Sequence, residues 1–319
     1  MYLNGLHHIT AVSANIKENL HFYTDILGLR LVKKSVNQDD VSAYHLFYAD
    51  KTGTPGTDLT FFDWPRIGKN TGGTDSIAGT AFRVNSRQAL EFWMERFKQL
   101  DIPHSEISIF AQREILPFQD PEGQRLYLVN DQGADFEGEL WPHPEIKDEF
   151  LIKGFYSAIL STAASVPLAE FLSRTLYFEE VARDRWIDGT SSGLIFTTLP
   201  EGGPGKEIWL LEQPHLPPAQ LGAGGTHHIA FRVADFDTQK EWHSYLEELG
   251  LPVSPLIDRF WFRSIYFRIS PGILFEIATD GPGFTLDEDP EKLGEKLILP
   301  PFLESRRQEI EAGLIPITG

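Results

Sequence analysis

The sequence predicts an α+β fold of four similar units, each a strand, a helix and three further strands (βαβββ), arranged in two halves. Two observations lead to this prediction. The same order of strand-like and helix-like segments recurs four times along the 319 residues. Aligning the first strands brings together His8, Gly79, Ser157 and His228, at intervals of 71, 78 and 71 residues. The repeated interval indicates a duplicated unit.

The first unit shows the whole pattern. After the strand-like stretch GLHHITAVS, the apolar residues Leu20, Tyr23 and Leu27 recur at helical spacing, and Gly28 is the expected end of the helix. Three β-like stretches follow, at residues 29–36, 43–50 and 58–65.

The fourth unit repeats this order. Its first strand is GTHHIAFRV, and its helix is expected to begin at the N-cap Asp235 and to end at Gly250. Units two and three are weaker copies, with helices near residues 86–100 and 167–177. The remaining expected strands are 253–259, 259–269 and 272–279 in unit four, 76–84, 113–118 and 124–130 in unit two, and 155–163, 194–199 and 207–212 in unit three.

The segments between units suggest a domain division. Residues 133–153 are acidic and contain proline, and we expect them to separate an N-terminal half, residues 1–132, from a C-terminal half, residues 154–282. Residues 283–319 lie outside the repeat and form a C-terminal extension, whose PPFLESRRQEIEAGL stretch predicts a short helix after the two prolines.

Composition excludes several kinds of protein. The chain has no cysteine, which rules out disulfides, zinc–thiolate sites and iron–sulfur clusters. The net charge of −18 disfavours nucleic acid and anionic membranes as partners. The N-terminus MYLNGLHHITAV lacks the features of a signal peptide, and no apolar run approaches the length of a membrane span, so we expect a cytoplasmic protein.

Two histidine pairs fall at the same point of the repeat. Alternation in a strand places His8 and Thr10 on one face, and likewise His228 and Ala230. Glu276 lies in the otherwise apolar stretch ILFEIAT, where a carboxylate is costly to bury unless it is paired or binds a metal. Its alternative partner is an arginine such as Arg268.

His8, His228 and Glu276 therefore predict a metal site with two imidazoles and one carboxylate, the ligand set of non-haem Fe(II) enzymes. Mn(II) and Zn(II) use similar ligand atoms, so spacing alone leaves the metal open. Glu276 follows Pro271-Gly272 at the same offset at which Thr60 follows Pro55-Gly56. Thr60 is therefore the unit-one equivalent of Glu276. The fourth corner of the site, meaning the position that would supply a fourth ligand if both units contributed equally, thus carries a poor metal ligand.

Units two and three offer Gly79, Ser157, Tyr127 and Trp209 at the comparable places, and no second metal site is expected there. The lone histidines are expected to be ordinary core residues. They are His21, His45, His104, His215 and His243.

The whole chain resembles the vicinal-oxygen-chelate superfamily of glyoxalases and extradiol dioxygenases. It looks most like the hydroquinone ring-cleaving branch, including the 2,6-dichlorohydroquinone 1,2-dioxygenases and the ring-cleaving dioxygenases of the Bacillus type. The matching stretches lie near both ends of the chain: GLHHIT, FYTDILGLRLVKKSVNQDD, YHLFYADKTGTPGTDLTFF, GTHHIAFRV, IDRFWFRSIYFR and GILFEIATDGPGFT.

The resemblance implies Fe(II) as the metal on His8, His228 and Glu276, in a cavity shared by the first and last units, with a small aromatic substrate and O2 as partners. It also implies catalytic roles around the metal for five further residues, which are His7, Thr10, His227, Arg259 and Tyr266. Strand alternation by itself, in contrast, points His7 and His227 away from the ligand face. Assembly into a homo-oligomer is left open.

Two other functions remain as alternatives. A glyoxalase-like isomerase or thiol transferase would use the same scaffold, but such enzymes usually carry a fourth protein ligand, where this chain has Thr60. A protein that sequesters a small molecule would need no metal triad. The preferred prediction is thus an Fe(II)-dependent ring-cleaving dioxygenase acting on hydroquinone-type aromatics.

Overall fold

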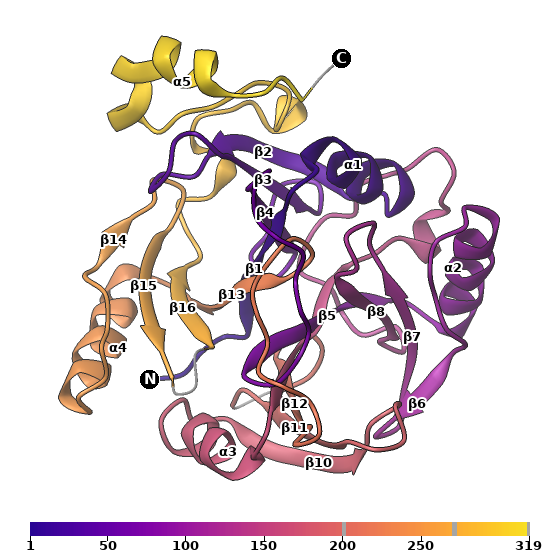
Figure 1. Cartoon of the computed structure of the whole chain (residues 1–319). Coiled ribbons are helices and arrows are strands. Elements are labelled where there is room, and N and C mark those ends of the chain that lie inside the picture. Colours follow the sequence, from indigo (N-terminus) through magenta and orange to yellow (C-terminus); the bar gives the residue numbers. More distant parts are fainter. Residues whose placement is uncertain (200–201, 270–272, 318–319) are drawn as a thin grey trace.

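The strands form two curved sheets, and each sheet joins two of the four repeat units (Figure 1). The computed structural model describes residues 1–199, 202–269 and 273–317, so the Pro271-Gly272 pair lies outside the described residues. The α+β fold of four βαβββ units is confirmed. Within the described part of the chain, no helix is long and apolar enough to cross a membrane.

Sheet one contains the first and fourth units, in the strand order β14-β15-β16-β13-β1-β4-β3-β2. At its centre the first strands of the two units, β1 and β13, pair antiparallel, so the units are joined edge to edge. The strands are β1 (Leu6–Ser13), β2 (Arg30–Val36), β3 (Tyr44–Ala49), β4 (Asp58–Asp63), β13 (Thr226–Val233), β14 (Ile257–Asp258), β15 (Arg263–Arg268) and β16 (Leu274–Thr279).

Sheet two repeats this arrangement with units two and three, in the order β10-β11-β12-β9-β5-β8-β7-β6. Its central pair is again antiparallel, between β5 and β9. The strands are β5 (Ser76–Val84), β6 (Ser108–Phe110), β7 (Arg113–Gln119), β8 (Arg125–Asn130), β9 (Gly154–Thr162), β10 (Glu179–Arg185), β11 (Ser192–Thr197) and β12 (Glu207–Glu212).

Each sheet thus takes one unit from residues 1–132 and one from residues 154–282. The expected division of the chain into two halves at residues 133–153 stays a proposal. The sheets themselves cross that division, because the first strand of a unit pairs with the first strand of its partner unit.

The strand predictions fail at the edges of the sheets. In unit four the expected strand 253–259 shortens to β14, since Pro255 has no N–H to donate to a strand ladder. The edge strands β6 and β10 were not predicted. β10 reads EEVARDR and is almost wholly exposed, so it lacks the apolar alternation that reveals a half-buried strand.

The helices follow the predicted positions. In unit four the Asp235 side chain accepts a hydrogen bond from the Thr238 backbone N–H and caps the helix as predicted. In unit one the helix changes after one and a half turns into a π-helical segment, which sequence periodicity cannot indicate. The helices of units one to four are α1 (Ile16–His21) with η1 (Phe22–Ile26), α2 (Arg87–Gln99), α3 (Ser165–Arg174) and α4 (Phe236–Glu248), and the linker holds the short η2 (Asp148–Phe150).

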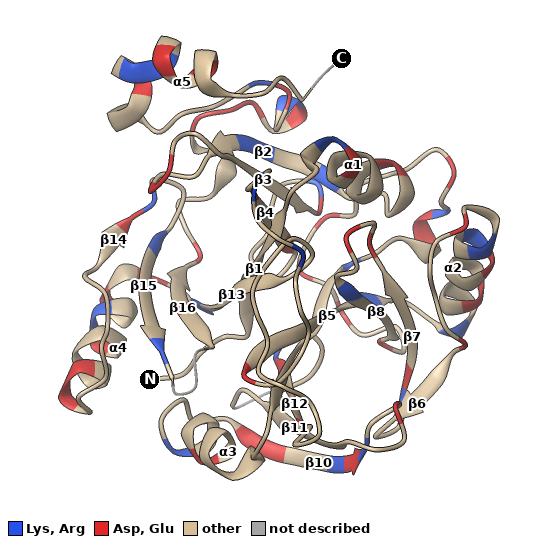
Figure 2. Ribbon diagram, in the orientation of Figure 1, with Lys and Arg blue, Asp and Glu red and all other residues tan. Residues whose placement is uncertain are grey.

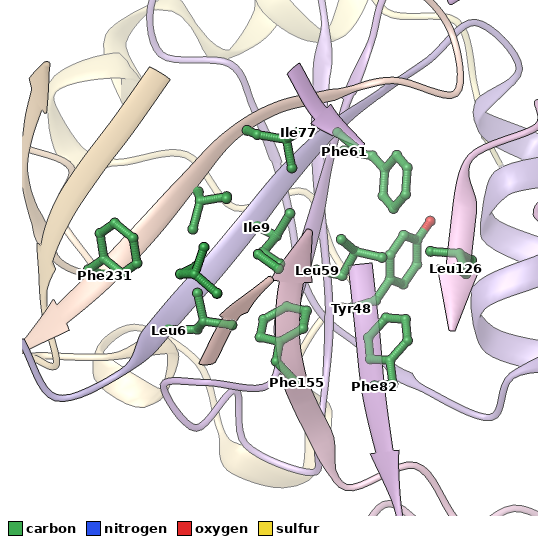
Figure 3. Packing of buried hydrophobic residues seen from close by; sticks show 14 of the residues in the cluster. Leu6, Ile9, Tyr48, Leu59, Phe61, Ile77, Phe82, Leu126, Phe155 and Phe231 are labelled. Carbon is green, nitrogen blue, oxygen red and sulfur yellow. The ribbon is translucent and has the colours of Figure 1, made fainter. Parts of the chain in front are cut away.

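A single large apolar core joins the two sheets (Figure 3). Leu6 and Ile9 of β1 and Leu59 of β4 lie close to Phe82 of β5 and Phe155 of β9. These five side chains are almost completely buried. Burying apolar surface on this side of sheet one leaves its opposite face, here called the site face, to carry polar residues.

Large aromatic rings occupy the corresponding positions of sheet two. The register places Tyr127 and Trp209 where sheet one has Thr60 and Glu276. These two rings pack with other aromatic residues of sheet two into a closed cluster. A Cβ on Gly79 would stand 2.7 Å from Cε2 of Tyr127, so a side chain at the position equivalent to His8 would displace this ring. Among the described residues the only group that could hold a metal lies in sheet one.

The C-terminal extension covers one end and one edge of sheet one. Phe284 and Leu293 join the apolar cluster on the site face, and Leu297 bridges to Lys34 on the edge strand β2. The rest of the extension packs into the main core through Leu299 and Leu303, among others. Its helical segments are η3 (Phe284–Leu286), η4 (Pro290–Lys292), η5 (Pro301–Arg306) and α5 (Arg307–Gly313).

The outer surface carries charges of both signs. Figure 2 shows Asp and Glu beside Lys and Arg on α2, α4 and α5. Some pair within one helical turn, as Arg306 does with Glu309 at 2.7 Å. Exposed pairs of this kind contribute little to stability. The extension is held by its buried apolar residues and by the ion pairs of the buried Lys33 with Asp287 and Glu288.

Neighbouring residues of η5 provide a matched test of that conclusion. Leu303 is 7% exposed in the core, whereas Phe302 is 58% exposed. We expect Leu303→Ala to lower the free energy of unfolding by about 2–3 kcal/mol. Phe302→Ala should change it by less than roughly 0.5 kcal/mol. Urea denaturation measures both, and equal losses in the two variants would contradict a strap held by its core contacts.

Candidate metal centre

Three buried side chains from distant parts of the chain converge on the site face of sheet one. Nε2 of His8 lies 3.3 Å from Nε2 of His228. Oε2 of Glu276 lies 3.2 Å from the first of these atoms and 3.0 Å from the second. All three residues are at most 4% exposed. The structure therefore brings together the three residues that the sequence predicted as metal ligands.

The register of three adjacent strands explains this convergence. β1 and β13 pair so that His8 lies opposite Ala230 and Thr10 opposite His228. β16 runs parallel to β13 on its other side and places Glu276 beside Ala230. The small Ala230 side chain leaves space between the three larger ones. Glu276 contacts the two imidazoles and accepts a 2.5 Å hydrogen bond at Oε1 from Ser264.

His7 and His227 reach the site, so the prediction from strand alternation was wrong. Each is the extra residue of a β-bulge between β1 and β13: the pairing skips His7 between Leu6 and His8, and it skips His227 between its two neighbours on β13. A bulge breaks the two-residue alternation and re-aims a side chain. Nδ1 of His7 lies 2.9 Å from Nδ1 of His8, and Nδ1 of His227 lies 2.8 Å from Nδ1 of His228.

These contacts set the orientation of the imidazole protons. Burial, followed by the neighbouring His8, lowers the pKa of His7 to about 3. Burial and the neighbouring His228 lower the pKa of His227 to about 3 in the same way. Both rings are thus neutral near pH 7. The Nε2–H of His7 donates to the Thr279 carbonyl 3.1 Å away, which leaves its Nδ1 as an acceptor for Nδ1–H of His8.

Nε2 of each inner histidine points at Oε2 of Glu276. Burial opposes ionisation of Glu276, but the two imidazoles outweigh it, and its pKa lies well below the usual range. Oε2 has no hydrogen-bond donor among the described residues. Two imidazole nitrogens and one carboxylate oxygen then face one another in a buried space. A divalent cation fits this set of donors, because it supplies the positive charge that they lack.

The fourth corner of the site holds no ionisable ligand. Thr60 occupies the place in unit one that Glu276 occupies in unit four, as predicted. Its Oγ1 donates to Oγ1 of Thr10 at 2.8 Å and lies 2.8 Å from Nε2 of His45. Thr10 thus lies beside the site and accepts a hydrogen bond from Thr60 of unit one. A metal held by His8, His228 and Glu276 alone would keep open coordination positions.

Arg259 and Tyr266 lie at the mouth of a small cavity beside His8 and His228. Arg259 makes two hydrogen bonds to Asp39, of 3.1 and 2.8 Å, and its guanidinium lies 5.5 Å from the centre of the Tyr266 ring. Burial, and then the charge of Glu276, raises the pKa of Tyr266, so its hydroxyl keeps its proton. The structure thus brings both residues to the site.

The cavity measures about 40 Å³. Cavities that accept benzene are nearer to roughly 150 Å³, so an aromatic ring enters only when wall residues move. Asp39 is the exposed partner in its pair with Arg259, with 72% of its side chain accessible. The Arg259 side chain is only 15% accessible, so this ion pair is half-buried and lies where the cavity wall meets the solvent.

His45 is a site residue that sequence reasoning missed. It was expected to be an ordinary core histidine, yet it lines the cavity opposite Arg259 and Tyr266. Its place in β3 could have revealed it. Strand alternation puts His45 on the same face as Phe47, and Phe47 pairs with Thr60 on β4.

Asp58 is an unusual buried residue on the site face. It is paired with His8 in the strand ladder and is 1% exposed, and neither carboxylate oxygen has a hydrogen-bond partner among the described residues. Burial raises its pKa to about 8, against the opposing effect of His8. Asp58 is therefore a protonated acid near neutral pH in the metal-free protein.

Comparison with known proteins gives consistent matches over the whole chain. A profile of the Glyoxalase/Bleomycin resistance protein/Dioxygenase superfamily matches residues 5–128. The chain is 44% identical over 317 residues to "Putative ring-cleaving dioxygenase MhqA" of Bacillus subtilis, covering 99% of this chain and 100% of that protein. It is 30% identical over 314 residues to "Chlorohydroquinone/hydroquinone 1,2-dioxygenase" of Sphingobium indicum, covering 97% and 95%.

A solved structure described as a "putative dioxygenase" from Bacillus subtilis has the same fold. Its TM-score is 0.90 at 37% identity, over 99% of this chain and 97% of that one. The family resemblance seen in the sequence is confirmed by these matches.

Metal binding can be tested directly with a matched pair of histidine variants. We expect the protein to bind one Fe(II) per chain and His8→Ala to weaken that binding by more than about a hundredfold, because two ligands remain. His21→Ala, on the exposed face of α1, should bind like the wild type. Anaerobic titration with Fe(II), followed by the rise in melting temperature on binding, measures this. Equal affinity in the two variants would contradict the assigned ligands.

Asp58 predicts a pH dependence of stability in the metal-free protein. The unfolded chain releases this proton near pH 3.8, whereas the folded chain keeps it up to about pH 8. Between these values the folded state binds the extra proton, so stability falls as pH rises, by at most about 1.4 kcal/mol per pH unit.

The variant Asp58→Asn removes this titration. We expect the unfolding free energy of the variant minus that of the wild type, measured in urea, to rise steadily between pH 5 and pH 7.5. A constant difference across that range would show that Asp58 is already ionised in the folded protein.

Proposed function

The chain belongs to the glyoxalase/bleomycin resistance protein/dioxygenase superfamily, and on that premise we propose that it is an Fe(II)-dependent dioxygenase that cleaves the ring of hydroquinone-type aromatics. The observation that carries the proposal is the buried set of His8, His228 and Glu276 with Thr60 at the fourth corner. Relatives named as ring-cleaving and hydroquinone dioxygenases support the reaction class and the substrate class.

Fe(II) is the preferred metal over Mn(II) and Zn(II). Two imidazoles and a carboxylate with open positions are the ligand set of non-haem Fe(II) oxygenases. A bound Fe(II) would supply the open coordination positions and the redox chemistry that ring cleavage by O2 requires.

His7 and His227 act in this proposal by positioning the two histidine ligands. Each accepts the Nδ1–H of its neighbour and leaves Nε2 free to bind the metal. Contacts of this kind fix the tautomer and the ring orientation of a metal-bound histidine. His7 is itself held by the Thr279 carbonyl, so the orientation is set by the backbone of β16.

Arg259 and Tyr266 handle the substrate. Arg259 carries a permanent positive charge at the cavity mouth and would attract and orient a phenolate. Tyr266 keeps its proton and can donate a hydrogen bond to an oxygen of the substrate. Thr10 contributes through its bond to Thr60, which holds the unit-one wall of the cavity in place.

The apolar cluster on the site face excludes water from the metal centre. Phe262 packs against His7 and His8, with ring centres 5.2 and 5.1 Å apart. Trp261 and, from the C-terminal extension, Phe284 close the same end of the site. A dry site strengthens the electrostatic contacts of Arg259 and protects reactive species from water.

Other functions of the same scaffold fit the site less well. A glyoxalase-like isomerase or thiol transferase would be expected to have a fourth ligand, and Thr60 is bonded to Thr10 and His45 instead. A protein that only sequesters a small molecule has no need for three buried groups that require a cation.

The proposal predicts oxygen consumption that depends on both iron and a hydroquinone. Iron-loaded wild type should take up O2 with hydroquinone faster than with catechol, measured with an oxygen electrode. Tyr266→Phe and Arg259→Ala should keep one iron per chain and lose turnover by about ten- to a thousandfold, since each removes a contact made to the reacting substrate.

Two results would contradict this prediction. Iron-loaded protein that isomerises methylglyoxal–thiol adducts but takes up no oxygen with any dihydroxybenzene would favour the glyoxalase-like alternative. Loss of iron in Tyr266→Phe would mean that this residue supports the metal and does not act on the substrate.

A further inference from the structure

We infer that His45 accepts a hydrogen bond from the substrate hydroxyl that is not on the metal, and that it thereby selects hydroquinones over catechols and simple phenols. This inference rests on the proposed function and deepens it. His45 lies on the wall of the cavity contributed by unit one, across from Arg259 and Tyr266 of unit four.

The internal symmetry of sheet one shows how His45 comes to be available. In unit four, Ser264 lies opposite Ala278 and donates to Glu276, two residues before Ala278 on β16. In unit one, His45 takes the place of Ser264: it lies opposite Phe62 and bonds to Thr60, two residues before Phe62 on β4. The same hydrogen bond therefore recurs in both units.

The chemistry of the two corners differs. Ser264 supports a carboxylate that faces the metal, whereas His45 bonds to a threonine that does not serve as a ligand. Unit one thus keeps His45 in the place of the supporting residue Ser264, but it has Thr60 in the place of the proposed ligand Glu276. A histidine at that place has a second ring nitrogen, which a serine lacks, and that nitrogen is free for another partner.

The hydrogen bonds determine which nitrogen that is. Oγ1 of Thr60 donates its hydrogen to Thr10, so Nε2 of His45 must be the donor in its 2.8 Å contact with Thr60. Nδ1 then carries the lone pair. It has no hydrogen-bond partner among the described residues, and it is not one of the fully buried unsatisfied atoms. The rings of Phe47 and Phe62, at 4.0 and 4.5 Å between centres, hold the imidazole in place.

Burial, and then the charges of His8 and His228, lowers the pKa of His45 well below its usual value. The ring is therefore neutral near pH 7. A metal cation bound nearby would act in the same direction. Neutral His45 is thus able to accept a hydrogen bond at Nδ1.

Several other polar groups of the cavity bond to neighbouring residues. Arg259 is a donor only and is paired with Asp39. The Gln38 amide donates to the Arg259 carbonyl, and the Asn37 side chain accepts from the backbone of Asp39. His45 offers a neutral acceptor to a hydroxyl that enters this part of the cavity.

Substrate geometry explains why this contact would discriminate. The two adjacent hydroxyls of a catechol can both reach one metal ion. The second hydroxyl of a hydroquinone lies across the ring and cannot, so it must find a partner in the protein or be buried without one. A buried hydroxyl without a partner costs more than a hydrogen bond contributes, and His45 removes that cost.

Two substitutions separate the two ring nitrogens of His45. His45→Gln places an amide nitrogen near Nε2 and keeps the bond to Thr60, but it removes the acceptor at Nδ1. His45→Asn places an amide oxygen near Nδ1 and loses the bond to Thr60. His21→Gln, at an exposed position on α1, is the matched control. Dissociation constants for hydroquinone, 4-methoxyphenol and phenol are measured anaerobically on iron-loaded protein, so no turnover is needed.

We expect wild type and His21→Gln to bind hydroquinone about tenfold more tightly than 4-methoxyphenol or phenol. His45→Gln should lose this preference while binding phenol as the wild type does, and His45→Asn should keep part of it. All variants should retain one iron per chain.

Each contrary result has its own meaning. If His45→Gln weakens the binding of hydroquinone and phenol by the same factor, His45 only shapes the cavity and the inference is wrong. If His45→Gln keeps the wild-type preference, the inference is wrong while the proposed function stands. A wild type that binds hydroquinone no better than phenol and takes up no oxygen with it overturns both.

Discussion

The antiparallel pairing of β1 with β13 is the contact on which the rest of the site depends. It joins the first and last units into one sheet and brings together two histidines separated by 220 residues. It also contains the two bulges at His7 and His227, so the same few backbone hydrogen bonds set the ligands and the residues that orient them. Glu276 enters through β16, which adds parallel to β13.

The two sheets use one backbone plan for opposite purposes. At equivalent register positions sheet one has His8, Thr60 and Glu276, and sheet two has Gly79, Tyr127 and Trp209. Large rings fill the second sheet, whereas small residues such as Ala230 and Ala278 keep the first sheet open beneath its aromatic cover. Duplication supplied two equivalent sets of positions, and among the described residues only the set in sheet one carries a group that could hold a metal.

Burial of the triad creates an electrostatic problem that a bound cation would solve. An ionised carboxylate at 0% exposure is costly in an apolar surrounding unless positive charge lies beside it. The C-terminal extension increases this burial, because Phe284 and Leu293 pack on the site face while Leu299 and Leu303 anchor the segment in the main core. The extension thus packs against both the main core and the site face.

The sequence by itself determined the four units, the three candidate ligands and the empty fourth corner at Thr60. These follow from local periodicity and from the equivalence of positions in a repeat, which survive in a linear pattern. The N-cap of α4 at Asp235 could likewise be predicted from the sequence, since a cap depends on residues within one helical turn.

The tertiary structure alone decided which units share a sheet, where the bulges fall and what His45 contacts. Strand alternation pointed His7 and His227 away from the ligand face, because a bulge depends on the pairing of two distant strands and leaves no trace in either one. His45 looked like any lone core histidine until its bond to Thr60 and its place on the cavity wall were known. Contacts between residues far apart in the chain carry this information, and a sequence states only the order of residues.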